Sequence, residues 1–384
     1  MFRLFLGLVF IVSLALGARA HGQGFESEAS HAVIMDHASG EILWEKNGAE
    51  PMIPASMTKM MTAFVVFERV RTGEIALTDQ FTVSENAWRK GGWSSGGSTM
   101  GLAIGDQPTV EELLRGVIIL SGNDACIVLA EGISGTEEAF AREMTALAQR
   151  MGLSTASFRN ATGLDEDGHR ISAIDLAVLA QLSIEEFPEF YAFYAEDAYE
   201  WRGIRQANRN PLLGRMDGVD GLKTGHLSVS GYGLTASAER AGERRIIVLN
   251  GMETEGDRAR EAERLMRLAF TAFETRYLKP ADLELPPLPV WMGTASTVGV
   301  ELAEPILIGG AKRDFALGKV ELVYQGPLEA PVVAGDPIGQ LVITLPDRDP
   351  VATDLVATED VAKTDFVGRV LDGLNRVITG GESS

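Results

Sequence analysis

Apolar residues recur through the first two thirds of the chain at three- and four-residue intervals, the spacing that gathers them on one face of a helix. This spacing predicts five helices between Ser56 and residue 187, over 57–71, 109–118, 122–133, 136–151 and 172–186. Runs rich in β-branched residues predict a hairpin within 29–49 and strands at 219–224, 230–238 and 244–250, followed by a helix at about 256–277. We therefore expect an α+β fold, with one sheet built from both chain ends and flanked by a helical middle.

A second domain is expected because 384 residues exceed what one hydrophobic core usually serves. The composition changes after Leu278, and the proline-rich stretch 285–289 is predicted as a stiff connector. Residues 289–358 contain short β-branched runs broken by Gly and Pro, which is typical of a small all-β domain. We place the first domain at 21–283 and the β-rich domain at 284–362.

Both termini carry apolar segments. Residues 1–20 combine Arg3, an apolar run and the small residues Ala18 and Ala20, the pattern of a cleaved signal peptide. The protein is therefore expected to be exported to the periplasm. Residues 363–380 place their apolar side chains on one helical face, which predicts an amphipathic terminal helix that docks either on the membrane or on the protein itself.

Composition excludes several classes of function. The formal charge of −20 argues against nucleic acid as a partner, and it requires any anionic substrate to meet a local basic cluster. The five histidines lack metal-ligand spacing, so neither a metal nor another cofactor is expected. Cys126 is the only cysteine, which excludes an internal disulfide, and its apolar surroundings predict a buried side chain.

Ser56 and Lys59 form the first candidate for chemistry, because residues three apart at the start of a helix share one face. A serine hydroxyl is a weak nucleophile until a base removes its proton. Lysine can be that base only if burial or a second cation lowers its pKa. By itself the spacing is weak evidence, since it is common on solvated helices.

Two further elements strengthen the hypothesis. Ser121-Gly122-Asn123 lies where an apolar run ends and a helix begins, so it could equally be a helix cap. Lys223-Thr224-Gly225 ends a predicted strand, where glycine would let a substrate backbone lie along the strand edge. The ordinary alternative is a strand followed by a turn.

Together the three elements match the motif set of β-lactamases and penicillin-binding proteins, with Ser-Gly-Asn in place of Ser-Asp-Asn. The chain resembles the low-molecular-mass penicillin-binding proteins of the D-alanyl-D-alanine carboxypeptidase family nearly end to end. The resemblance is carried by segments 55–62, 121–125, 158–164, 208–210 and 217–226. It implies a β-lactamase/transpeptidase-like domain with an antiparallel sheet, and a C-terminal helix that contacts the cytoplasmic membrane from outside.

The resemblance also implies roles. Ser56 would be the nucleophile and Lys59 the general base, with nearby Lys223 helping to keep Lys59 partly deprotonated by like-charge repulsion. Ser121 would be a proton relay, and Asn123 would hold the substrate backbone. The backbone N–H groups of Ser56 and His226 would form the oxyanion hole. Candidates for binding the substrate carboxylate are Lys223, Thr224, Arg209 and Arg260, and for Arg260 an ordinary solvated ion pair is the alternative.

The expected substrate is a peptidoglycan stem pentapeptide that loses its terminal D-Ala, and β-lactams are the expected inhibitors. A D,D-endopeptidase would use the same motifs. A class A β-lactamase is disfavoured because no Glu-x-x-Leu-Asn segment lies between Ser121 and Lys223. A noncatalytic wall-binding protein is disfavoured by the intact motif residues.

Overall fold

A five-stranded antiparallel sheet, in the order β2-β1-β7-β6-β5, organises the first domain of the computed structural model, which describes residues 25–346 and 348–365. Two strands come from the N-terminal region and three from beyond residue 218, as predicted. The strands are β1 (His31–Asp36), β2 (Ile42–Lys46), β5 (Val219–Leu227), β6 (Gly231–Arg240) and β7 (Glu243–Met252).

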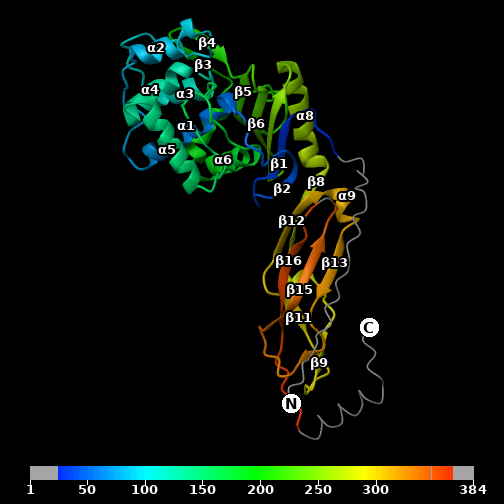
Figure 1. Cartoon of the computed structure of the whole chain (residues 1–384). Helices are drawn as coiled ribbons and strands as arrows, with labels where there is room; N and C mark the ends of the chain where they lie inside the picture. Colours follow the sequence, from blue (N-terminus) through cyan, green and yellow to red (C-terminus); the bar gives the residue numbers. More distant parts are fainter. Residues whose placement is uncertain (1–24, 347, 366–384) are drawn as a thin grey trace.

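Both faces of this sheet are covered, which explains why β1 is apolar at nearly every position. Alternate side chains of a strand point to opposite faces. Val33 and Met35 pack into the core beneath the helical region, whereas Ile34 packs with Leu265 and Met266 of α8 (Glu255–Thr271). The sheet is therefore the middle layer between α8 and the other helices (Figure 1).

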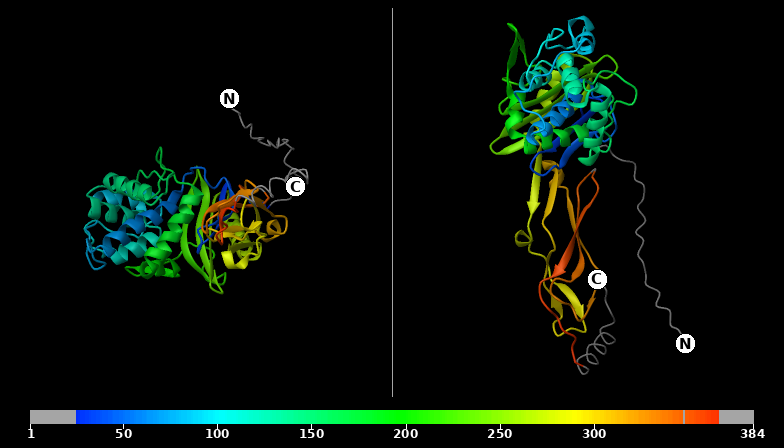
Figure 2. Two further views of the ribbon diagram at one scale, coloured as in Figure 1. Left: turned by 90° about the horizontal axis from the view of Figure 1, so that it is seen from below. Right: turned by 90° about the vertical axis from the view of Figure 1, so that its left-hand side faces the viewer.

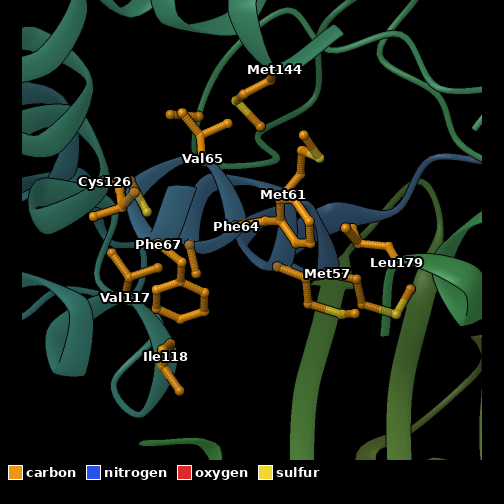
Figure 3. Close-up of a cluster of buried hydrophobic side chains, with 14 of the residues drawn as sticks. Met57, Met61, Phe64, Val65, Phe67, Val117, Ile118, Cys126, Met144 and Leu179 are labelled. Atoms are coloured by element: carbon orange, nitrogen blue, oxygen red, sulfur yellow. The ribbon is translucent and has the colours of Figure 1, made fainter. Parts of the chain in front are cut away.

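The helix that follows Ser56, α1 (Lys59–Arg71), is buried all round along its first nine residues. Figure 3 shows Phe64 and Phe67 of α1 among side chains from α3, α4, α5 and α6, with Met57 of the preceding turn beside the sheet. Cys126 belongs to the same cluster and is buried, as predicted. A helix held on all sides gives the residues at its N-terminus a fixed position.

The remaining helices of this region largely match the predicted ones. They are α3 (Val110–Ile118), α4 (Asn123–Ser134), α5 (Glu137–Arg150) and α6 (Ala173–Glu186). Several short elements were not predicted, because they are too brief to show a period: α2 (Glu85–Gly91), α7 (Pro188–Tyr191), β3 (Ala198–Trp201), β4 (Ile204–Ala207), and the 3-10 turns η1 (Ala55–Thr58), η2 (Trp93–Ser95) and η3 (Ala192–Ala195).

One predicted element was partly wrong. The helix expected to reach residue 277 ends at Thr271, and β8 (Phe273–Leu278) follows it and pairs with β12 (Ile306–Ala311). The alternation of Phe273, Thr275 and Tyr277 suits a strand, and pairing with a distant segment decides the outcome.

The C-terminal region is all β apart from two short helical turns, η4 (Pro280–Asp282) and α9 (Lys312–Phe315). Its apolar side chains form two small cores, one around Leu288 and Val298 and one around Leu341 and Leu355. The stretch expected to be a plain connector leads directly into a strand, and Leu288 is buried. The further strands are β9 (Leu288–Trp291), β10 (Thr297–Val298), β11 (Val300–Leu302), β13 (Lys319–Val323), β14 (Leu328–Glu329), β15 (Pro337–Thr344) and β16 (Val351–Ala357).

The two regions meet at the edge strand β2, where Gly309 of β12 lies against Leu43 and Glu41. From there the β-rich region extends away as an elongated body (Figures 1 and 2). β5, which carries the Lys223 motif, is the opposite edge of the sheet. Among the described residues, no helix is both long and apolar enough to cross a membrane. The predicted signal peptide, and residues 366–380 of the predicted terminal helix, lie outside the described part.

Candidate active site

Ser56 lies in η1, the single turn that precedes α1. The residue before it, Ala55, has a φ of +50°, a left-handed conformation that is uncommon for a residue with a side chain. Gly163 packs against this turn so closely that a Cβ at residue 163 would lie 1.9 Å from the Ala55 carbonyl oxygen. The serine is therefore presented on a turn that its neighbours hold tightly in place.

Lys59 is 1% exposed and converges on three acceptors. Its Nζ donates to Ser56 Oγ at 2.9 Å, to Asn123 Oδ1 at 2.8 Å and to the Thr162 carbonyl at 2.5 Å. Burial, assisted by the positive charge of Arg209, lowers the pKa of Lys59 to about 8. The contact that the sequence predicted between Ser56 and Lys59 is therefore present, with a lysine that can lose its proton near neutral pH.

Lys223 reaches the same centre from β5. Its Nζ donates to Ser121 Oγ at 3.0 Å and to the Thr224 carbonyl at 3.2 Å. The pKa of Lys223 is well below its usual value, chiefly through burial and then through repulsion by Lys59. Burial is thus the leading cause for both lysines. The family resemblance had implied that Lys223 helps to lower the pKa of Lys59, but the cation that lowers it is Arg209, whereas Lys59 lowers the pKa of Lys223.

Ser121 and Asn123 flank the start of α4. Ser121 has a φ of +59°, so it interrupts the run from α3 and turns its hydroxyl toward Lys223. The adjacent Asp124 is fully buried and accepts bonds from Thr99 Oγ1 and from the backbone N–H groups of Met100, Gly101 and Leu102, at 2.6–3.0 Å. This carboxylate anchors the 98–102 loop beside Asn123.

Gly225 has a different role from the one expected. A Cβ there would lie 2.7 Å from the Pro54 carbonyl oxygen and 3.3 Å from Ala55 Cβ. The glycine therefore lets β5 lie against the Ser56 turn, whereas the sequence had suggested that it made room for a substrate. Thr224 is buried beside it, and the His226 side chain is exposed.

The loop between α5 and α6 also contributes to the site, because its Thr162 carbonyl contacts Lys59. Asn160 Oδ1 accepts bonds from the Thr162 and Gly163 N–H groups at 3.2 and 2.8 Å, which shapes the turn that presents the Thr162 carbonyl to Lys59. Behind this turn His169 Nε2 lies 2.8 Å from Thr58 Oγ1. Burial lowers the pKa of His169 to about 4, so the ring is neutral at physiological pH. Thr162 was missed from the sequence because it contributes only a backbone carbonyl, which every residue has.

Arg209 lies at the mouth of the site, where its Nη1 donates to Ser98 Oγ. Two asparagines fix its position: Asn208 Nδ2 donates to the Glu196 carbonyl at 3.0 Å, and Asn210 Nδ2 donates to the Gly221 carbonyl of β5 at 2.7 Å. The structure therefore brings Arg209 next to the predicted centre.

Arg260 is not part of the site. Its side chain is 75% exposed and pairs with Asp257 one turn earlier on α8, which is the ordinary alternative considered for it. Arg258, two residues earlier, is 3% exposed, and its charge contributes to lowering the pKa of Lys223. Its guanidinium lies 5.8 Å from the centre of the Tyr232 ring, which stacks on His226. The period of the buried α8 residues 258, 262, 265 and 269 was the signal available in the sequence.

These contacts define a class of protein: a serine hydrolase whose nucleophile is served by a buried lysine rather than by histidine. Lys59 touches Ser56 directly, whereas Lys223 touches Ser121. The described residues contain no group of three His, Cys, Asp or Glu side chains placed to hold a metal.

Comparison with known sequences places the chain within this class. The profile of the peptidase family S11, described as D-alanyl-D-alanine carboxypeptidase, matches residues 18–254, and that of the penicillin-binding protein 5 C-terminal domain matches 273–363. D-alanyl-D-alanine carboxypeptidase DacC of Escherichia coli strain K12 is 36% identical over 372 residues, covering 95% of this chain and 93% of that relative. DacF of Bacillus subtilis strain 168 is 35% identical, covering 88% and 87%. The chain belongs to the D-alanyl-D-alanine carboxypeptidase family.

Solved structures agree with this assignment. Penicillin-binding protein 5 from Haemophilus influenzae superimposes with a TM-score of 0.68 at 35% identity, covering 88% of this chain and 99% of that one. DacD from Francisella tularensis gives a TM-score of 0.77 at 29% identity, covering 91% and 100%. Penicillin-binding protein D2 from Listeria monocytogenes, solved in an ampicillin-bound form, gives 0.56 at 29% identity, covering 64% and 99%.

Proposed function

We propose that this protein removes the terminal D-Ala from peptidoglycan stem pentapeptides through an acyl-enzyme on Ser56. The observation that carries the proposal is the 2.9 Å contact between Lys59 Nζ and Ser56 Oγ, made by a lysine whose pKa burial lowers to about 8. Such a lysine is partly neutral at physiological pH and can accept the serine proton.

In acylation, neutral Lys59 takes the proton of Ser56 while Oγ attacks the carbonyl carbon of the penultimate D-Ala. The backbone N–H groups of Ser56 and His226 are the proposed donors to the resulting oxyanion. Ser121, bonded to Lys223 at 3.0 Å, passes a proton to the nitrogen of the departing D-Ala as the C–N bond breaks. Water then attacks the Ser56 ester, which releases the shortened peptide and restores the hydroxyl.

The D-Ala carboxylate requires cations despite the acidic chain. Lys223, Thr224 and Arg209 remain the proposed partners, and Arg258 replaces Arg260. Asn123, already bonded to Lys59 at 2.8 Å, is proposed to hold the peptide backbone. A local cluster of buried or partly enclosed cations overcomes the repulsion from the net charge of −20 because nearby charges act more strongly than distant screened ones.

The two arginines of α8 offer a matched pair of variants. Arg258→Ala is expected to raise the KM for a D-Ala-D-Ala peptide about tenfold, because it removes a buried cation whose Nε has no hydrogen-bond partner in the structure. Arg260→Ala is expected to leave KM within about twofold, because that side chain is an exposed ion pair. Steady-state release of D-Ala measures both, and the reverse ranking of the two variants would restore Arg260 to the site.

A fluorescent penicillin tests the proposed nucleophile. The wild type is expected to be labelled covalently and Ser56→Ala is expected to remain unlabelled, because an ester to residue 56 needs its hydroxyl. Equal labelling of both proteins would refute the mechanism.

Release of free D-Ala from diacetyl-L-Lys-D-Ala-D-Ala distinguishes a carboxypeptidase from the alternatives. An endopeptidase would instead cleave cross-linked peptides, and a noncatalytic scaffold would release nothing. Rapid turnover of the penicillin label would indicate a β-lactamase.

Export and membrane contact complete the proposal. The pattern of residues 1–20 supports cleavage after Ala20, and the apolar face of 363–380 supports peripheral attachment to the outer face of the cytoplasmic membrane. N-terminal sequencing of the purified protein and its release from membranes after removal of 363–384 would test the two parts separately.

A further inference from the structure

An exposed tryptophan lies in the turn of residues 92–98, which contacts Asn123 and is here named the Trp93 turn. Trp93 is 59% exposed, and residues 94–97 are exposed as well. Large apolar side chains at the surface of a soluble protein are unremarkable singly, but beside a catalytic centre they mark places where a ligand can rest. Neither the acylation steps nor the carboxylate site uses this side chain.

The Trp93 turn is anchored at both ends to the start of α4. Before it, Gly91 lies so close that a Cβ would come within 2.2 Å of the Asp124 nitrogen. After it, the Asn123 N–H donates to the Ser98 carbonyl at 2.8 Å. Within it, Gly97 lies where a Cβ would be 2.8 Å from Asn123 Nδ2. The turn therefore has a defined position relative to Asn123, the residue proposed to hold the substrate backbone.

The indole ring of Trp93 packs against the backbone of Gly101. Gly101 has a φ of +89°, and a Cβ there would lie 2.9 Å from Trp93 Nε1 and 3.2 Å from Cε2. Only a glycine lets the ring approach the backbone so closely. Because Trp93 rests on Gly101 and still leaves 59% of its surface exposed, the ring offers an open surface from a fixed position.

The length of the substrate decides which part of it can reach this ring. In a stem pentapeptide the reacting carbonyl belongs to the fourth residue and the amino sugar is attached to the first, so an extended chain places them roughly 10–14 Å apart. Gly97 and Trp93 are four residue steps apart, so their Cα atoms lie at most about 14 Å from each other. Residue 97 lies against Asn123, so a stem peptide that runs from Asn123 along the Trp93 turn would bring its sugar end to Trp93.

We propose, resting on the function proposed above, that Trp93 is a stacking platform for the amino-sugar ring that carries the stem peptide. A pyranose presents a face of C–H groups, which packs on an aromatic ring while its hydroxyls remain solvated. The exposed hydroxyl of Ser94 lies next in the chain and offers a polar partner at the rim. An uncharged sugar is not repelled by the acidic chain, so this contact needs no compensating cation.

The test compares three substrates that share the same scissile bond: a disaccharide pentapeptide, the free pentapeptide and diacetyl-L-Lys-D-Ala-D-Ala. Trp93→Ala is expected to raise KM about five- to tenfold for the disaccharide pentapeptide alone, with kcat unchanged for all three. Trp93→Phe should recover most of the affinity because it keeps a ring. Tyr277→Ala, which removes a 54% exposed aromatic side chain from β8, is the control and should change nothing.

The outcomes separate the possibilities. An unchanged KM of Trp93→Ala for the disaccharide pentapeptide would overturn the sugar assignment. An equal rise of KM for the free pentapeptide would also overturn it, because it would show that the ring contacts the peptide. Equal effects on all three substrates, with a lowered melting temperature, would show that Trp93 only supports the site and would overturn it too. If the wild type released D-Ala from none of the substrates, the proposed function would fail first.

Discussion

Replacing Lys59 with arginine is expected to slow acylation of Ser56 by roughly a thousandfold, the typical contribution of a positioned general base. A guanidinium remains charged at any physiological pH and cannot accept the serine proton. The rate of covalent labelling by a fluorescent penicillin measures the effect.

Lys223→Arg is the matched control for this variant. Lys223 contacts Ser121 rather than Ser56, and arginine preserves the positive charge proposed to meet the substrate carboxylate. Its labelling rate should fall much less than that of Lys59→Arg. If the two variants exchanged ranks while both retained the wild-type melting temperature, Lys223 would be the base and the assignment of Lys59 would be wrong.

The acylation rate of the wild type is expected to depend on pH through the lowered pKa of Lys59. Burial lowers the pKa of Lys59 from 10.5 to about 8, so the neutral, competent form is lost as pH falls through about 8. At pH 7 roughly one molecule in ten would carry neutral Lys59, against roughly one in three thousand for an unshifted lysine. The acylation rate should rise close to tenfold per pH unit below 8 and then level off. A flat profile from pH 6 to 9 would contradict a lysine base with this pKa.

Removing the carboxylate of Asp124 is expected to have the largest effect on stability. Asp124→Ala should lower the free energy of unfolding by about 3–4 kcal/mol, because a buried acceptor of five hydrogen bonds disappears and the N–H groups of Met100 and Leu102 lose their partner. Urea denaturation at neutral pH measures the change.

Asp124→Asn serves as the control, since it keeps one acceptor oxygen of similar shape. About half of the loss is expected for it, and penicillin labelling should be slowed more in the alanine variant because the loop also contacts Asn123. A loss below about 1 kcal/mol in Asp124→Ala would mean that the loop holds its position without this carboxylate.

Long periodic segments were predictable because their apolar pattern is repeated many times. The helices near residues 110–118, 137–150 and 173–186 follow directly from it. The segment 273–278 was not predictable, because its neighbours in sequence suggest a helix whereas its partner in the sheet, β12, lies about thirty residues away. The same limit applies to the hairpin of β3 and β4, whose four-residue strands are too short to show a pattern.

The site likewise contains contacts that local sequence predicts and contacts that it does not. Ser56 and Lys59 are neighbours on one turn, so local geometry alone predicts their contact. The contact of Lys223 with Ser121 joins residues 102 positions apart and was not predicted, although the resemblance to a family implied that both residues belong to one site. The choice between Arg258 and Arg260 depended on which side of α8 faces the sheet, and two residues along a helix turn a side chain by more than half a circle.

The sequence by itself determined the chemistry available to this protein: a serine with a lysine one turn away, two further polar motifs and a net charge that demands local cations. Only the tertiary structure decided whether Lys59 can act as a base, because its burial depends on residues distant in the chain. Enclosure by α3 to α6 and the sheet removes water from Lys59 and so lowers its pKa. Close packing of Gly101 against the indole likewise holds an exposed tryptophan in a defined position, on a turn that contacts Asn123.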